Sequence, residues 1–352
     1  MLVLITGGTG LVGAHTAAAV VAAGHRVRIM ARDATGVDRA LSPLGVPPDL
    51  IEVMAGDVTD EKDVTAAVRG SDAVLHAASV YSFDARRHGE TRRINVRGTE
   101  LVLAAARSAG VARTIYVSTF GAMLPAPGGL VVPWSPVGNA KETYLASKAA
   151  AERIARRHQE EGAPVVISYP PALLGPHDPK LGDQTSRLRY MLRGMMPIWP
   201  TGGFPVGDVR DTAALHAALL TVPSDGLDRY IGPGRYVSTR EYVDTVRAVT
   251  GRSLPTLFLP ARTMLPFARL VDVAQRVWPW HIPAEYGACY VCACDARSGD
   301  TAPARGLVPR PFSRTLADTV RWLHDTGRLT AAQAGAAAAA ELSDSAETPA
   351  AA

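Results

Sequence analysis

The sequence predicts an α/β fold in which a doubly wound parallel sheet carries helices on both faces. In the first half of the 352-residue chain, short runs rich in β-branched residues alternate with longer Ala-rich segments of helical period, an alternation typical of βαβ units. The runs are almost wholly apolar, as expected for strands buried on both sides. The expected strands are residues 2–6, 26–31, 50–54, 73–76, 113–118 and 165–169. The expected helices are residues 11–23, 61–69, 90–109 and 144–161.

The composition favours a globular protein with a sizeable core, because 47% of the residues are hydrophobic. No apolar run reaches the roughly 20 residues that span a membrane. The apolar start, Met1 to Ile5, has no basic region before it and runs at once into glycines, which argues against a secretory signal and favours a cytoplasmic protein. The net charge of +4 comes from arginines spread along the chain, so we expect no nucleic-acid partner.

The three cysteines, Cys289, Cys292 and Cys294, fall in one short stretch. Their number and the expected compartment exclude a disulfide framework. No second ligand pair with zinc spacing exists, so we expect no metal site. The alternation around Ala293 favours a half-buried strand of small apolar residues instead.

The chain changes character after Gly175, where Pro and Gly become frequent and helices are separated by loops. We expect a first domain over residues 1–175 and a smaller α/β region over 176–330, interleaved with the first and packed beside the carboxyl edge of the sheet. Residues 331–352 are Ala-rich and lack aromatic residues, which predicts a frayed helix or a disordered tail. The expected helices of the second region are residues 185–193, 212–220, 239–250 and 315–325.

A glycine turn follows the first expected strand and opens the first expected helix, with the sequence TGGTGLVG over residues 6–13. Two of its glycines allow a tight turn close to a pyrophosphate, and the last lets the helix pack on the strand. Unpaired N–H groups at the positive end of the helix would meet the phosphate charge. The sequence therefore predicts a Rossmann-type dinucleotide site. The expected phosphate-binding residues are Gly7, Gly10, Leu11, Val12 and Gly13.

The second strand ends at Ala31-Arg32-Asp33. An acidic residue at this end would bind the ribose hydroxyls of NAD, whereas an arginine favours the 2′-phosphate of NADP. Because Arg32 occupies the end and Asp33 comes one position later, the sequence favours NADP(H) and leaves NAD(H) possible. The alternative is a solvated turn pair.

The ends of the third and fourth strands add further candidates. Asp57 either accepts from an adenine amino group or caps the next turn. His76, at the end of the fourth strand, is expected to be a core histidine rather than a catalyst. Ala77 and Ala78 come next, and their small side chains leave room for a cofactor.

Tyr144 and Lys148 stand four residues apart, so they share one face of a helix. A free phenol has a pKa near 10, and a nearby ammonium lowers it, which makes the phenol a usable general acid or base. Thr119 and the preceding Ser118 end the fifth strand, at the sheet edge where ligands bind in doubly wound folds. One of these hydroxyls can bind a substrate carbonyl oxygen. A structural helix-face pair and a strand-end turn are the alternatives.

Taken in order, these motifs resemble the extended short-chain dehydrogenase/reductases of the NAD-dependent epimerase/dehydratase superfamily, most closely the dihydroflavonol-4-reductase and 3β-hydroxysteroid dehydrogenase-like branch. The resemblance covers roughly residues 1–326. It implies an oxidoreductase that interconverts a ketone and a secondary alcohol by hydride transfer with NAD(P)(H). The motifs are residues 6–13, Gly56-Asp57-Val58-Thr59-Asp60, His76-Ala77-Ala78, Asn95-Val96-Arg97-Gly98-Thr99, Tyr116-Val117-Ser118-Thr119, Tyr144 with Lys148, Pro170 to Pro176, Asp208-Val209-Arg210-Asp211, and Pro309-Arg310-Pro311 before Trp322-Leu323.

The resemblance implies a role for each catalytic candidate. Thr119 falls on the catalytic Ser/Thr position, and Tyr144 would be the general acid in reduction. Lys148 would hold the nicotinamide ribose and lower the pKa of the tyrosine. Asn95 would order the helix and serve a proton relay.

The resemblance also places the rest of the cofactor. Asp57 and Val58 would flank the adenine, and Pro170 to Leu173 would line the nicotinamide. Many relatives form homodimers through the helices represented here by residues 90–109 and 144–161, so a homodimer is expected.

The sequence departs from the family in two places. Tyr169 stands where relatives often have an arginine before the proline, which puts any role of that arginine in doubt. The loop over residues 120–143 lacks the Ala-Val-Tyr-Gly run typical of sugar-nucleotide epimerases. That absence weakens the main alternative, an epimerase or dehydratase with tightly bound NAD. A cofactor-binding sensor without turnover is a third hypothesis, disfavoured by the intact catalytic candidates.

The substrate pocket is expected from four variable segments, residues 80–84, 120–134, 177–204 and 259–290. Their apolar, aromatic and Met-rich content suits a hydrophobic ketone or alcohol, steroid-, terpenoid- or flavonoid-like, although half of these residues are expected in the core. The arginines at 187, 189 and 193 would suit a diphosphate or form a solvated helix face. The candidate lining residues are Tyr81, Phe83, Met123, Trp134, Met191, Met195, Met196, Trp199, Phe267 and Trp278.

Overall fold

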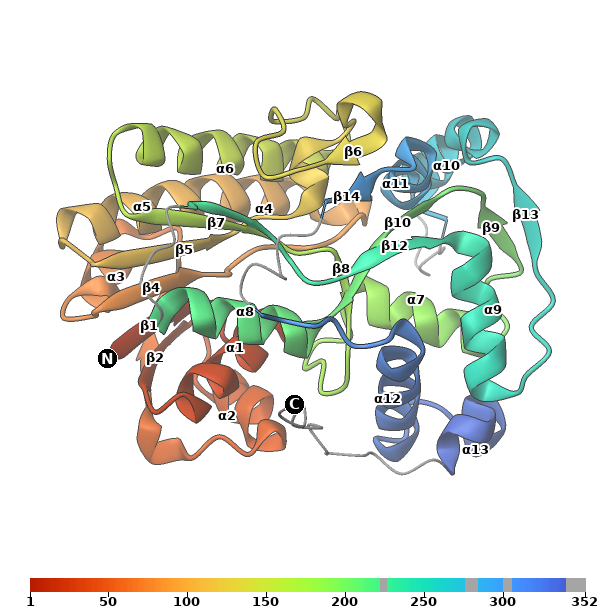
Figure 1. Ribbon diagram of the computed structural model, residues 1–352, viewed down its shortest axis with the longest axis horizontal. Helices are drawn as coiled ribbons and strands as arrows, with labels where there is room; N and C mark the ends of the chain where they lie inside the picture. Colours follow the sequence, from red (N-terminus) through yellow and green to blue (C-terminus); the bar gives the residue numbers. More distant parts are fainter. Residues whose placement is uncertain (222–226, 276–283, 300–305, 340–352) are drawn as a thin grey trace.

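A seven-stranded parallel sheet forms the centre of the protein (Figure 1), with the order β11-β7-β5-β4-β1-β2-β3. The computed structural model describes residues 1–221, 227–275, 284–299 and 306–339. The strand order runs outward in one direction from β1 to β3 and in the other direction from β4 to β11. Such a switch point between the neighbours β1 and β4 leaves a crevice at the carboxyl ends of the strands. The predicted fold class is therefore confirmed. The strands are β1 (Leu2–Thr6), β2 (Arg26–Ala31), β3 (Ile51–Ala55), β4 (Ala73–His76), β5 (Arg113–Val117), β7 (Val165–Tyr169) and β11 (Arg229–Ile231).

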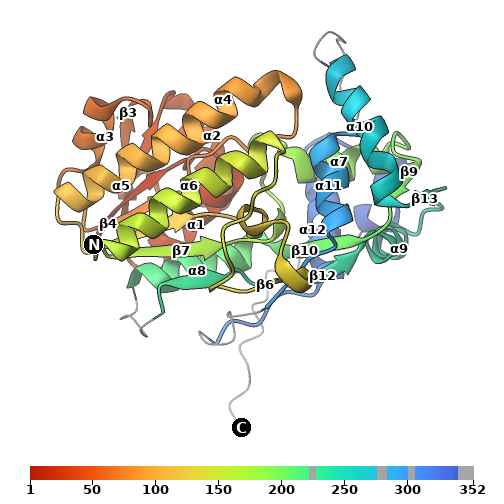
Figure 2. The ribbon, with the colours of Figure 1, turned by 90° about the horizontal axis from the view of Figure 1, so that it is seen from above.

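Helices cover both faces of this sheet (Figures 1 and 2). One layer packs Ala14, Ala17 and Val20 against strand residues such as Ile5 and Ile29. The last strand and one covering helix come from beyond residue 175, so later sequence completes the sheet layer. The helices on one face are α1 (Leu11–Ala22), α2 (Thr35–Leu41) and α8 (Val209–Thr221), and on the other α3 (Glu61–Val68), α5 (Thr99–Ser108) and α6 (Thr143–Glu160).

The helix expected over residues 90–109 is interrupted. It is divided into α4 (His88–Arg92), a π-helical turn (Arg93–Gly98) and α5. π-turns inside helices often occur at functional sites. Here the turn carries Asn95, whose amide reaches the segment that follows β4.

The second region lies beside the carboxyl edge of the sheet (Figure 1). It shares one large core with the sheet, in which Tyr169 and Trp199 are fully or almost fully buried. Its strands are β9 (Ile198–Pro200), β10 (Gly203–Asp208), β12 (Arg235–Ser238), β13 (Leu257–Leu259) and β14 (Arg297–Ser298). Two short strands from before residue 176 pair with them, β8 (Ala172–Leu174) with β10 and β6 (Leu130–Val131) with β14. Its helices are α7 (Asp183–Leu192), α9 (Thr239–Thr250), α10 (Ala261–Gln275), α11 (Tyr286–Cys294) and α12 (Phe312–Asp325).

One expectation about the later sequence, the strand at the cysteines, is wrong. The cysteine stretch is the helix α11 rather than a strand, because Cys289 and Cys292 lie three residues apart on one buried face. The low-complexity segment begins with an ordered part, α13 (Ala331–Ala334) and a 3₁₀ turn (Gly335–Ala338), that buries Ala334 and Ala337. Residues 340–352 lie outside the described part of the chain.

Within the described ranges, no helix is long and apolar enough to cross a membrane. In the same residues, no group of His, Cys, Asp and Glu side chains is placed to hold a metal ion.

Candidate active site

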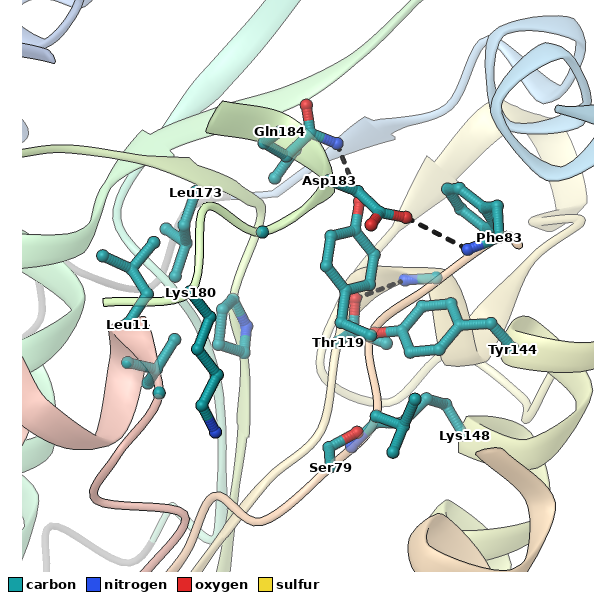
Figure 3. Close-up of a pocket in the computed structure, with 18 of the residues that line it drawn as sticks. Leu11, Ser79, Phe83, Thr119, Tyr144, Lys148, Leu173, Lys180, Asp183 and Gln184 are labelled. Atoms are coloured by element: carbon teal, nitrogen blue, oxygen red, sulfur yellow. Dashed lines mark hydrogen bonds between the residues drawn. The ribbon is translucent and has the colours of Figure 1, made fainter. Parts of the chain in front are cut away.

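A cavity of ≈ 570 Å³ lies at the carboxyl edge of the sheet. It runs from the glycine turn after β1, past the ends of β4 and β5, to α7, α10 and α11 in the second region (Figure 3). Every expected site residue except Asn95 lines it. These are Gly7, Gly10, Leu11, Val12, Gly13, Arg32, Asp57, Val58, Ala77, Ala78, Thr119, Tyr144, Lys148, Pro170 and Leu173.

The glycine turn has the shape that a dinucleotide requires. Gly7 has φ +78°, and a Cβ there would lie 2.6 Å from the Ala78 amide nitrogen. A Cβ on Gly13 would collide with the Gly7 carbonyl oxygen. Larger residues would therefore push the helix off the strand and close the cradle, which fits the phosphate-binding role expected of such a turn.

Arg32 and Asp57, the residues expected near the adenosine part of a cofactor, both line the cavity. The Asp33 carboxylate accepts hydrogen bonds from the Thr35 amide (3.0 Å) and hydroxyl (2.8 Å), so it is engaged in its own turn. Asp57 likewise accepts from the Thr59 amide and hydroxyl at 2.8 Å. Desolvation acts to raise the pKa of Asp57, but these hydrogen bonds hold it below its usual value. The capping alternative considered for Asp57 is therefore present, while the residue still lines the cavity.

His76 is a core residue, as expected. It is 1% exposed, and its ring lies within hydrogen-bonding distance of the hydroxyls of Thr6 (2.7 Å) and Thr99 (3.1 Å). Burial, aided by the charge of Lys148, lowers the pKa of His76 to about 3. The ring is thus a neutral link between β1, β4 and α5.

Tyr144 and Lys148 share one face of α6 and are both buried. The Glu142 carboxylate accepts from the amides of Tyr144 (2.9 Å) and Leu145 (2.8 Å), which starts the helix at Thr143. The Lys148 ammonium donates to the Val117 carbonyl (2.8 Å) at the end of β5. Burial lowers the pKa of Lys148 to about 8.

The phenol of Tyr144 is protonated in this environment. Burial raises its pKa well above the usual value, and the neighbouring Tyr81 and Tyr116 raise it further. Its ring packs edge-on against Tyr81 at 4.9 Å and Phe83 at 5.7 Å. The expected lowering of this pKa by Lys148 is therefore not seen in this structure, because desolvation dominates.

Thr119 lies beside Tyr144 at the end of β5 (Figure 3). Its hydroxyl oxygen accepts from the Gly121 amide at 3.2 Å, which caps the 3₁₀ turn that follows. A hydrogen bond with this hydroxyl acts to lower the pKa of Tyr144, against the effect of burial. The two side chains thus form one polar patch in the wall of the cavity.

Asn95, expected to order the helix and also named as a cofactor-binding candidate, is not among the lining residues, and its cofactor role stays a prediction. Its amide oxygen accepts from the Val80 amide (2.8 Å) and the Ser79 hydroxyl (3.0 Å). Its amide nitrogen donates to the Ser147 hydroxyl at 2.9 Å, which in turn donates to the Tyr144 carbonyl at 2.7 Å. Asn95 therefore positions α6 relative to the segment after β4.

Tyr169, the departure from the family pattern, is buried beneath α6. Its hydroxyl donates to the Glu152 carboxylate at 2.7 Å and accepts from Arg156 at 3.3 Å, and Arg156 donates to Glu152 at 2.8 Å. The residue before Pro170 therefore serves a buried polar cluster and does not line the cavity.

The expected substrate-lining residues that the structure describes separate into three groups. Those that line the cavity are Tyr81, Phe83, Met196, Trp199 and Phe267. Met123 and Met191 are core residues, and Trp134 and Met195 are exposed to 76% and 48%. Trp278 lies outside the described residues.

Sequence reasoning missed a polar group at the far wall. Gln184 donates to the Tyr81 hydroxyl at 2.7 Å, and the Asp183 carboxylate accepts from the Phe83 amide at 3.0 Å (Figure 3). Arg187 forms an ion pair with Glu285 at 3.1 Å, with 11% and 8% of the side chains exposed. No local motif marks Asp183, Gln184 or Glu285, because α7 and the residue before α11 come together only in the folded chain. Arg187 itself was among the expected candidates.

Of the three arginines considered for a diphosphate, only Arg187 lines the cavity. Its charge is balanced by Glu285. The guanidinium of Arg189 lies over the ring of its neighbour Tyr190, 5.6 Å from the ring centre. The far wall therefore presents little net positive charge to a ligand.

The chain resembles proteins of one family. The model of the NAD dependent epimerase/dehydratase family matches residues 3–231. "Sterol demethylase protein B" of Methylococcus capsulatus is 29% identical over 94% of this chain and all of that protein. A "putative dihydroflavonol 4-reductase" of Synechocystis is 30% identical, covering 92% of this chain and 94% of the relative. A "3-beta-hydroxysteroid dehydrogenase" of Mycolicibacterium neoaurum is 28% identical over 79% of this chain and 76% of the relative.

Solved structures share the fold. The crystal structure of gox2253 matches with a TM-score of 0.75 and 24% identity, over 93% of this chain and 99% of that one. DesIV of Streptomyces venezuelae, a dTDP-glucose 4,6-dehydratase with NAD bound, matches with a TM-score of 0.72 and 22% identity, over 94% and 100%. The chain therefore belongs to the NAD dependent epimerase/dehydratase family, as an extended short-chain dehydrogenase/reductase that uses a nicotinamide cofactor and acts on CH–OH groups.

Proposed function

We propose that this protein is an NADP(H)-preferring oxidoreductase that interconverts a ketone and a secondary alcohol on a hydrophobic small molecule. One observation carries the proposal: a single cavity joins the glycine turn and Arg32 to Tyr144, Lys148 and Thr119, and then to an apolar wall. The cofactor, when bound, supplies or accepts the hydride.

Tyr144 donates the proton in the direction of reduction. Its buried phenol is protonated at neutral pH, and it lies beside Thr119, so both hydroxyls are available to one carbonyl oxygen. As the alcohol forms, the phenol becomes a phenolate. The ammonium of Lys148 on the same helix face would favour that anion, and we expect the same side chain to hold the nicotinamide ribose.

Arg32 supports the preference for NADP(H). The carboxylate of Asp33, the other candidate at the end of β2, is engaged with Thr35. Arg32 is therefore the charged group of this strand end that lines the cavity, and a guanidinium suits a phosphate.

The substrate half of the cavity supports a hydrophobic ligand. Aromatic and thioether side chains line it, and apolar walls with a few polar groups are typical of small-molecule sites. The relatives named for sterols, steroids and dihydroflavonols fit this class. A sugar-nucleotide epimerase would need free positive charge for the diphosphate, whereas Arg187 is paired with Glu285.

The test is the oxidation of NADPH and NADH by the purified protein in the presence of a panel of hydrophobic ketones. We expect ketone-dependent oxidation that is faster with NADPH at subsaturating cofactor. Copurified NAD, with no net turnover of any ketone, would instead favour the epimerase or dehydratase alternative.

A homodimer through α5 and α6 also belongs to this proposal. Exposed charges dominate the outer side of these helices, with Arg157 3.7 Å from Glu100. A dimer held there would depend on ion pairs, so light scattering at low and high salt tests it.

A cytoplasmic location stays a prediction, which cell fractionation would test.

A further inference from the structure

We propose that Lys180, which the second half of the chain brings into the cavity, binds a phosphate group of the nicotinamide cofactor together with Arg32. The inference deepens the proposed function and rests on its cofactor site. Lys180 follows no strand of the sheet and belongs to no motif of the sequence.

The contact that carries the inference joins two distant parts of the chain. The Lys180 ammonium donates to the hydroxyl of Thr9 at 3.1 Å, across 171 positions of sequence. Thr9 belongs to the glycine turn and also lines the cavity. Figure 3 shows the Lys180 side chain extending past Leu11 into the space between the glycine turn and Ser79.

The loop that presents Lys180 is held in place. The Asp178 carboxylate, 2% exposed, accepts from the amides of Lys180 (3.2 Å) and Gly182 (2.8 Å) and from the Thr185 hydroxyl (2.7 Å). Leu181 adopts φ +47°, a conformation that side-chain-bearing residues seldom adopt. These bonds tie the loop to the start of α7 and aim the lysine at the glycine turn.

The charges around Lys180 suit an anion. Arg32 and Arg87 line the same cavity, and Arg87 pairs with Glu90 at 3.0 Å. Desolvation lowers the pKa of Lys180, and the charges of Arg32 and Arg87 lower it further, whereas Asp178 and Glu90 act in the opposite direction. A phosphate placed among these cations would relieve their mutual repulsion.

In this arrangement two cationic side chains from different parts of the chain contact the cofactor. Arg32 approaches from the end of β2, and Lys180 approaches from the loop that precedes α7. A lysine supplies a compact charge on a flexible stem, which suits a phosphate that is already cradled by backbone N–H groups. The Thr9 hydroxyl can then turn to the same phosphate.

The experiment is a fluorescence titration of the full chain with NADPH and with NADH, comparing wild type with Lys180→Met. Removing one charge-assisted hydrogen bond should weaken binding roughly tenfold or more, and should reduce its dependence on salt. Lys62→Met, an exposed lysine on α3 that does not line the cavity, is the matched control and should bind like wild type. Lys180→Arg should retain most of the affinity, because it keeps the charge.

The two cofactors distinguish the phosphate involved. A loss confined to NADPH places Lys180 at the 2′-phosphate, and an equal loss for both places it at the pyrophosphate. Unchanged affinity for both cofactors in a folded Lys180→Met protein overturns the inference. A comparable loss in Lys180→Arg would also overturn it, because charge would then not be the cause. The titration needs no ketone, so the failure of the proposed reaction would leave this result standing.

Discussion

The two halves of the cavity are built in different ways. In the half proposed for the nucleotide, Gly7, Arg32 and Ala77 each follow directly after a parallel strand and Asp57 comes one residue later, and the sheet brings these strand ends to one edge. In the half proposed for the substrate, the lining comes from the segment after β4, from α7, from Met196 and β9, and from α10 and α11. The first half is a local feature repeated along the sheet, whereas the second exists only where remote segments pack together.

Polar groups also differ between the halves. The nucleotide half presents backbone N–H groups and arginine to a charged ligand. The substrate half buries its main charges against each other, in the pair Arg187–Glu285. A ligand there meets an apolar wall and an ion pair whose two charges compensate each other. Such a wall names no particular functional group of a substrate, so the sequence indicates the class of cofactor more narrowly than the substrate.

The largest effect is expected where the two halves meet, at Tyr144. Tyr144→Phe removes the proton donor and should lower kcat/KM by about 10²–10⁴-fold, while the affinity for NADPH stays close to that of wild type. Steady-state kinetics and cofactor titration measure the two quantities. Tyr190→Phe, outside the cavity, is the matched control and should leave both unchanged. Turnover by Tyr144→Phe at the wild-type rate would refute the mechanism.

The next largest effect is expected on stability, from the buried ion pair Arg187–Glu285 of the substrate half. Glu285→Gln leaves the Arg187 guanidinium without its buried counter-charge, and should lower the free energy of unfolding by about 3 kcal/mol. Denaturant unfolding measures it. Arg193→Met, exposed at the end of α7, should change stability by less than about 0.5 kcal/mol. A loss for Glu285→Gln as small as this control would mean that the pair is not energetically coupled.

The stability of the protein is expected to depend on pH through His216, a residue of α8 that contacts α1. Its ring lies 3.1 Å from the Thr16 hydroxyl and 2.9 Å from that of Ser168, and burial lowers its pKa to about 3. Between that value and about 6.5 the unfolded chain binds a proton that the folded protein excludes, so stability falls as pH falls through this window. The slope is about 1.4 kcal/mol per pH unit for one such group.

His216→Gln should remove this part of the slope, while His76, whose pKa is also lowered to about 3, retains its own. Unfolding free energies at several pH values between about 4 and 6 give the slopes. Equal slopes for wild type and His216→Gln would show that the ring is not kept neutral by burial.

The smallest effect concerns the end of β2. Arg32→Asp should reduce the preference for NADPH over NADH by roughly ten- to a hundredfold, because a guanidinium–phosphate contact becomes a repulsion. The ratio of the two dissociation constants measures it. Asp33→Asn is the control, and should leave the ratio nearly unchanged because the Asp33 carboxylate is engaged with Thr35. An unaltered ratio in Arg32→Asp would remove Arg32 from the 2′-phosphate site.

The expected site residues that line the cavity share one property: each lies in or beside a motif next to a strand or on α6. Asn95 differs from them, because its amide joins α6 with the segment after β4 and does not line the cavity. The cysteine stretch was misread because an alternation of three residues is too short to distinguish a strand from a helix. Trp134 and Met195 are exposed, because the chemistry of an aromatic or thioether side chain does not determine whether it faces solvent or a pocket.

Strand positions, the glycine turn, Arg32 and the Tyr144–Lys148 pair are determined by the sequence alone, because each depends on a local pattern within a few residues. The protonated state of Tyr144, the Arg187–Glu285 pair and the crossing of Lys180 to Thr9 were decided only by the tertiary structure. Desolvation and long-range charge contacts depend on which segments are buried together, and residues such as Thr9 and Lys180, 171 positions apart, come together only when the chain folds.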